Sequence, residues 1–245
     1  PPPAPPRVVA PLQIQTVRNA KHQPGGAIAS VISHPAVSLD GTLPDASRTS
    51  SFSAVRKLEK AWPWDLQRKV AADKRLRLEL CQSERALLNY RLARLHSLDA
   101  DVLIGHNIAG HTMTVLLQRL SAFRMNNWSR LGRMRVKTMP RLSGGGAFDG
   151  GNWAEWSVVA GRVMCDTFVS ARELLTSQRS YSLKELARTQ LAANKPDVET
   201  AAVPLMYEET TSLLQLVRSC ENDAFLSVQL MLKLQILPLT RQLTA

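Results

Sequence analysis

The most distinctive gap in the sequence is a long stretch without acidic residues. From Val102 through Phe148, 47 consecutive residues include no Asp or Glu. Nucleases that hold two divalent ions need clustered carboxylates, with the ions roughly 3.5–4 Å apart beside the scissile phosphate. Carboxylate oxygens are also the ligands that suit Mg²⁺ and Mn²⁺. The region in which an α/β nuclease would place such ligands is therefore poor in them.

Cysteine, metal-binding histidine pairs and long apolar runs are also scarce. Cys81, Cys165 and Cys220 are widely separated and lack metal-ligand spacing, which predicts small buried thiols in a reducing compartment. His106 and His111 have no third ligand at zinc spacing. No run approaches the roughly 18 apolar residues of a membrane span, and the N-terminus has no signal-peptide core. We therefore expect neither a zinc site nor insertion into a membrane.

What the chain does contain is positive charge on an otherwise ordinary globular composition. Its 245 residues include 31 Lys and Arg against 20 Asp and Glu, a net charge of +11. Hydrophobic residues make up 44% and charged residues 21%, which excludes disorder throughout the chain. The length suits one large domain or two small ones. The charge points to a polyanionic partner, nucleic acid first and an acidic membrane surface second.

Hydrophobic periodicity predicts strands alternating with helices, which is typical of an α/β layered domain. Strands are expected at residues 7–17, 27–33, 101–105 and 162–165, the first two paired, with a loop over 38–53. Helices are expected at 83–97, 113–123, 169–178, 182–191 and 208–237. Ser83 and Asp166 stand where helix N-caps are needed. The sequence has no internal repeat.

Two glutamines on the first predicted strand have the spacing of an acidic metal-binding pair. Gln13 and Gln15 are two residues apart, so their side chains lie on the same face of the strand. This is the spacing of an Asp-x-Glu metal pair, but neutral amides cannot hold a divalent cation comparably. The pattern alone favours two polar residues on a solvated strand face.

A resemblance to a known family begins at Gly105–Leu120 (GHNIAGHTMTVLLQRL). This stretch resembles the second exonuclease motif of the family B DNA polymerases, and most closely that of their α-type replicative members. Further stretches support the resemblance in the same order along the chain: Trp128–Leu142, Gly161–Leu175, Ser180–Leu186 and Asp223–Leu239. The resemblance as a whole covers nearly the entire chain, from about Arg7 to its C-terminus.

The resemblance implies a nuclease site that has lost most of its ligands. The first-motif acids correspond to Gln13 and Gln15, and the second-motif acid corresponds to Thr112. The third-motif acid is retained as Asp223, but its partner tyrosine corresponds to Ser219. One carboxylate cannot build a two-metal centre, so we expect no catalytic residue and no metal here. For Asp223 a capping or salt-bridging role is favoured.

The acid-free stretch also carries a basic segment, Arg124–Arg141, that could bind nucleic acid. Guanidinium groups interleaved with a tryptophan could contact phosphates and stack on bases. The alternatives are a solvated surface or a docking face for another domain of the same polypeptide. The candidate residues are Arg124, Trp128, Arg130, Arg133, Arg135, Lys137 and Arg141.

The resemblance implies an RNase H-like exonuclease domain over residues 7–245, with a mixed central sheet flanked by helices. Residues 1–6 are interpreted as a proline-rich linker, and the last helix as leading toward an absent palm domain. The implied parent is a nuclear replicative polymerase that extends RNA primers on a DNA template. It would use Mg²⁺ in its palm and work with primase subunits that bind outside this chain. The fragment itself is expected to be a monomer that does not polymerise and packs against other domains of its polypeptide.

Two other functions remain open from the sequence. One is an active 3′–5′ exonuclease with substitute ligands such as Asp166, Glu185 and Asp223, which requires those acids to converge in space. The other is a stand-alone basic module that binds nucleic acid strongly and with a steep dependence on salt.

Overall fold

The protein is built on a mixed six-stranded sheet with the strand order β4-β3-β2-β1-β5-β6. The computed structural model describes residues 7–18, 24–37, 50–73, 76–140 and 153–239. β1 pairs antiparallel with β2, and β2 with β3, whereas the β3–β4, β1–β5 and β5–β6 pairs are parallel. The strands are β1 (Arg7–Arg18), β2 (Pro24–Val37), β3 (Ser50–Arg56), β4 (Leu78–Cys81), β5 (Val102–Gly105) and β6 (Val163–Asp166).

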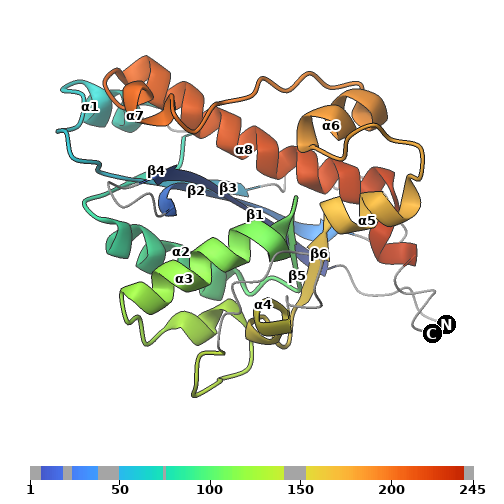
Figure 1. Ribbon diagram of the computed structural model, residues 1–245. Helices are drawn as coiled ribbons and strands as arrows, with labels where there is room; N and C mark the ends of the chain where they lie inside the picture. Colours follow the sequence, from blue (N-terminus) through green and yellow to red (C-terminus); the bar gives the residue numbers. More distant parts are fainter. Residues whose placement is uncertain (1–6, 19–23, 38–49, 74–75, 141–152, 240–245) are drawn as a thin grey trace.

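Helices cover both faces of this sheet (Figure 1). The long helix α8 crosses one face with α5, α6 and α7 beside it, and α2, α3 and α4 lie on the other face. A π-helical turn, η2 (Ile108–Met113), precedes α3, and a 3₁₀ turn, η3 (Trp128–Leu131), follows it. The α-helices are α1 (Leu66–Ala72), α2 (Glu84–Leu98), α3 (Thr114–Ala122), α4 (Trp153–Val158), α5 (Thr167–Leu174), α6 (Leu183–Leu191), α7 (Val203–Met206) and α8 (Thr210–Lys233). The predicted α/β fold with a mixed sheet is confirmed.

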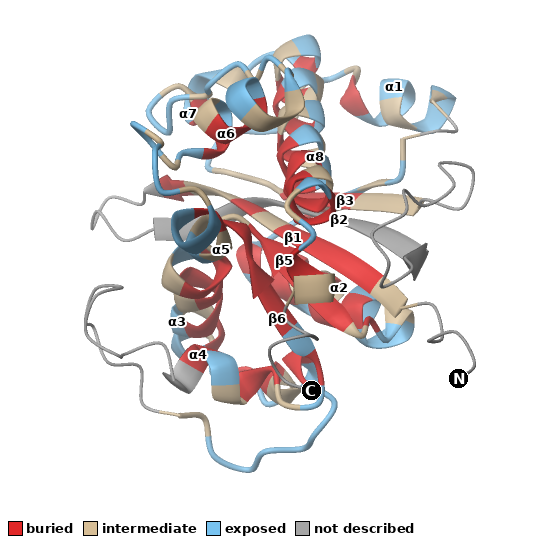
Figure 2. Cartoon of the chain, turned by 90° about the vertical axis from the view of Figure 1, so that its right-hand side faces the viewer, coloured by how far each residue is buried: buried red, intermediate tan, exposed pale blue. Residues whose placement is uncertain are grey.

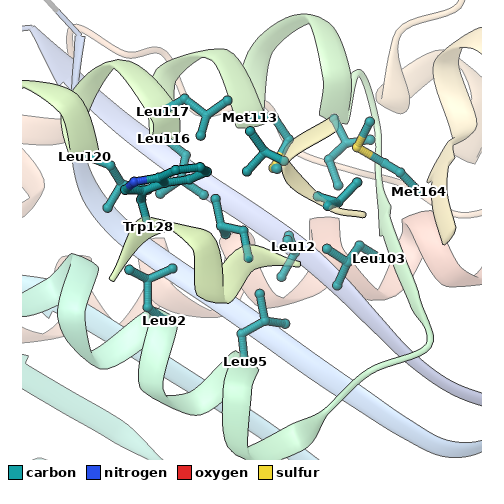
Figure 3. Packing of buried hydrophobic residues seen from close by; sticks show 14 of the residues in the cluster. Leu12, Leu92, Leu95, Leu103, Met113, Leu116, Leu117, Leu120, Trp128 and Met164 are labelled. Carbon is teal, nitrogen blue, oxygen red and sulfur yellow. The ribbon is translucent and has the colours of Figure 1, made fainter. Parts of the chain in front are cut away.

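Alternating residues of β1 place apolar side chains in both layers. Leu12 and Ile14 pack toward α2 and α3, in a cluster that includes Leu92 (Figure 3). Val9 and Val17, on the opposite face, join clusters that contain residues of α8. Figure 2 shows the result as a band of buried residues along the sheet and the adjoining helix faces. None of the described helices combines the length and apolar content that a bilayer span requires.

Ser83 caps α2 as predicted, and Ser182 caps α6 in the same way. The hydroxyl oxygen of Ser83 accepts a hydrogen bond from the Ala86 amide at 3.2 Å, and that of Ser182 does so from Glu185 at 3.3 Å. Such caps satisfy amides that have no partner within the helix. The helix expected at 169–178 instead runs from Thr167 to Leu174, because Asp166 caps it directly after β6.

The expected loop over residues 38–53 is wrong in part, because residues 50–53 belong to β3. Residues 38–49 lie outside the described part of the chain, as do residues 1–6 and the three glycines at 144–146. The strand was missed because its serines mask the apolar alternation. Ser53 is fully buried, and its hydroxyl donates a hydrogen bond to Oε1 of Glu221 on α8 at 2.6 Å.

Candidate functional site

The carboxyl ends of β5 and β6 are held together by Asp166. Its carboxylate accepts hydrogen bonds from the amides of Asn107 (2.9 Å), Ala109 (3.2 Å) and Phe168 (2.9 Å). Burial nevertheless raises the pKa of Asp166 above its ordinary value, against the effect of these amides. The predicted capping role is confirmed, and the carboxylate also fixes the turn that begins η2.

The same end of the sheet contains a buried neutral histidine and the second-motif position. Nε2 of His106 lies 2.9 Å from the carbonyl oxygen of Tyr181, and Nδ1 lies 3.1 Å from Oγ1 of Thr167. Burial lowers the pKa of His106 to about 4, so its ring is uncharged at neutral pH. Thr112, within η2, is 3% exposed. This arrangement supplies hydrogen bonds but no negative charge.

The two first-motif positions lie under α8. Gln13 and Gln15 are half-buried, and they alternate in phase with Val9 and Val17, which pack against that helix. The expectation of a solvated strand face is therefore wrong. The polar pair lies in the layer between β1 and α8, and no local pattern in the sequence indicates that a helix covers it.

Asp223 comes from α8 and is buried in the same half of the molecule. Its Oδ1 lies 3.4 Å from Nζ of Lys195, and this ion pair confirms the predicted salt-bridging role. Burial raises the pKa of Asp223 to about 6, although Lys195 opposes that shift. Oδ1 has no hydrogen-bond donor in the described part of the chain. Ser219 is half-buried one turn earlier on the helix.

The donor set at this position does not fit a two-metal centre. Asp166 is occupied by backbone amides, Glu185 pairs with Arg188 at 2.6 Å, and Asp223 pairs with Lys195. Within the described residues, no three His, Cys, Asp or Glu side chains are grouped so that they could hold a metal ion. The substitute ligands considered from the sequence thus lie in separate polar networks.

Part of the predicted basic segment forms a groove at the other end of β5 and β6. The groove has a volume of about 1020 Å³, and Arg130, Arg135 and Lys137 line it as exposed residues. Asp99, which precedes β5, and Arg162, which precedes β6, also line it. Because β5 and β6 are parallel, their amino ends lie together and so do their carboxyl ends. The groove is therefore at the amino ends of these strands, and the Asp166 network is at their carboxyl ends.

Two residues of the predicted nucleic-acid set make contacts that stabilise the fold. Trp128 is 7% exposed and packs in the core near Leu92 and Leu120, so stacking on a base is wrong for this residue (Figure 3). Arg133 also lines the groove as an exposed residue, but its guanidinium is held by the carboxylates of Asp99 and Asp101, each at 2.9 Å.

The other members of that set differ in how the structure places them. Arg124 is exposed but does not line the groove, and Arg141 lies outside the described residues. Lys195 and Arg162 were not predicted, because a single lysine in a connector and a single arginine before a strand form no recognisable pattern.

Comparisons with known proteins bear on this arrangement. The sequence profile of the DNA polymerase family B exonuclease domain matches residues 5–186. The chain is 40% identical over 256 residues to the DNA polymerase alpha catalytic subunit of Oryza sativa, covering 98% of this chain and 17% of that protein. Identity to the subunits of Arabidopsis thaliana and Xenopus laevis is 36% and 34%, over 98% of this chain and 17% and 16% of theirs. The chain thus spans about a sixth of the length of these relatives, and the RNase H-like fold class is confirmed.

Proposed function

The chain belongs to the exonuclease domains of the family B DNA polymerases, and from this premise we propose that it is a proofreading-inactive domain of an α-type catalytic subunit. The domain acts as a scaffold and as support for the template strand. Its parent extends RNA primers in the nucleus, with Mg²⁺ in the palm and primase subunits bound elsewhere. Similarity to α catalytic subunits over 98% of the chain supports this assignment.

One observation carries the loss of nuclease activity. Of the positions that correspond to the metal ligands, Gln13, Gln15 and Thr112 supply only neutral groups, and the single acid, Asp223, is paired with Lys195. Two-metal hydrolysis depends on charge stabilisation by ions that several carboxylates hold. The expected loss in rate is therefore several orders of magnitude.

The scaffold role is supported by the way α8 integrates the fold. Residues of this helix enter three separate apolar clusters, with Val17 and Leu66, with Val9 and Ile104, and with Leu186. A helix that packs in three clusters has a fixed orientation, so it is suited to orient a neighbouring domain of the parent polypeptide. The groove residues Arg130, Arg135 and Lys137, together with Arg124 and Arg141, are the proposed phosphate contacts.

A nuclease assay on 5′-labelled single-stranded DNA with Mg²⁺ or Mn²⁺ tests this proposal. We expect no cleavage above background, either from the chain as it stands or from Asp223→Ala. Metal-dependent cleavage that Asp223→Ala abolishes would overturn it, since other groups would then have to replace the missing carboxylates.

A further inference from the structure

Lys195 is unusual because its charge is directed into the protein. It lies in the connector between α6 and α7, yet its side chain is only 11% exposed. Its Nζ lies 3.4 Å from Oδ1 of Asp223 and 3.4 Å from Oδ1 of Asp197. Oδ2 of Asp197 in turn lies 3.0 Å from Nζ of Lys184 on α6. A single ammonium group thus joins the connector to the middle of α8.

The charge of this ammonium acts on ionisable groups of two different elements. Its charge opposes the raised pKa of Asp223 on α8, and it contributes to the lowered pKa of His106 after β5. Lys195 therefore lies between α8 and the carboxyl ends of β5 and β6. This is the half of the molecule that holds Asp223 and, under α8, the half-buried Gln13 and Gln15.

We propose that the Lys195 ammonium is a built-in replacement for the metal ions of this site. The inference rests on the proposed loss of nuclease function and adds a second, independent barrier. Replacing carboxylates with amides removes ligands, whereas a fixed cation beside Asp223 also repels any divalent ion that approaches. Like charges brought together in a partly dehydrated site are strongly disfavoured. The site therefore binds a divalent ion only weakly even after its acids are restored.

The same ion pair gives the connector a fixed place. The segment from Ala192 to Ala202 has no helix of its own, and its one deeply placed cation is fastened to Asp223. A metal ion would hold acids of the core together, but a lysine ties a peripheral segment to them. Lys195 is thus a positioning residue that uses the retained acid as its anchor.

Restoring the acids with and without Lys195 tests the proposal. In the full chain, Gln13→Asp, Gln15→Glu and Thr112→Asp are combined, and Mn²⁺ binding is measured by electron paramagnetic resonance. We expect weak binding, which becomes at least about tenfold tighter when Lys195→Met is added. Lys195→Arg, which keeps the charge, should exclude Mn²⁺ as the lysine does. Lys184→Met is the matched control, because Lys184 pairs with Asp197 and does not contact Asp223.

Equal Mn²⁺ affinity with and without Lys195→Met would overturn the proposal. Because Thr112 is buried, Thr112→Asp could unfold the chain, and Gln13→Asp with Gln15→Glu then provides the same comparison on half-buried positions. Circular dichroism verifies folding of each variant. Metal-dependent cleavage by the unaltered chain would instead contradict the proposed function, so the two failures are distinguishable.

Discussion

Nη1 of Arg162 lies 3.1 Å from Oδ1 of Asp99, the same carboxylate oxygen that Nε of Arg133 contacts at 2.9 Å. Asp99 ends α2 in the left-handed region, with φ of 45°. Hydrogen bonding to Arg133, with the nearby charge of Arg162, holds the pKa of Asp99 below its ordinary value. This pairing ties the end of α2 to the start of β6 and forms one wall of the basic groove.

Replacing Arg162 should destabilise the fold. Its side chain is 1% exposed and donates to the carbonyl oxygens of Leu131 and Ala100, which Arg162→Met would leave without that donor. We expect a loss of about 3 kcal/mol in the free energy of unfolding, measured in urea. Arg124→Met, at an exposed position, should change it by less than about 0.5 kcal/mol. Equal stability of both variants would contradict the buried network.

Trp128 should matter for stability and not for DNA binding. Trp128→Ala removes a large side chain from the core and should cost about 3–5 kcal/mol in thermal or chemical unfolding. Trp128→Phe keeps most of that packing, so its affinity for single-stranded DNA, measured by fluorescence anisotropy, should equal that of the unaltered chain. A fall in affinity at unchanged stability would show that the indole reaches the nucleic acid.

The groove should contribute to DNA affinity through charge alone. Combining Arg130→Gln with Lys137→Gln should weaken binding of single-stranded DNA for every sequence tried. For each phosphate that the double variant no longer neutralises, the slope of log affinity against log salt should fall by about 0.7. Arg68→Gln combined with Arg85→Gln is the matched control, because both arginines are exposed and neither lines the groove. Equal effects from this control would mean that only net charge matters.

Asp223 should give the fold a measurable pH dependence. Its pKa is about 6 in the folded chain and near 3.8 when unfolded, so its contribution to stability is complete below pH 3.8 and is lost as pH rises through 6. Asp223→Asn removes this pH-dependent contribution, and the variant should gain up to about 3 kcal/mol relative to the unaltered chain between pH 4 and pH 7.5.

Both chains contain the other titrating groups, so the contributions of these groups cancel in the difference in unfolding free energy. His106 is one of them, and its lowered pKa makes stability rise with pH over the same range. Urea unfolding at several pH values measures the effect. A stability difference that is independent of pH would contradict the buried environment of Asp223.

How far sequence predicts this fold depends on whether the signal is local. α2 was predicted from spaced leucines and the Ser83 cap, which act within one helix. β3 was missed because Ser53 is satisfied by Glu221, 168 residues away in the chain. The same applies to the site. The loss of acids could be seen at Gln13 and Thr112, but the cation at Asp223 depends on a connector that only the folded chain brings there.

The three cysteines are all buried, and the two that lie in the sheet can serve as reporters. Cys81 lies on β4 and Cys165 on β6, the two outer strands. Burial raises the pKa of these thiols to about 11 and about 12, so neither forms the reactive thiolate at neutral pH. The alkylation rates of Cys81 and Cys165 would therefore report separately how fast each edge strand of the sheet opens. No probe has to be added to the chain.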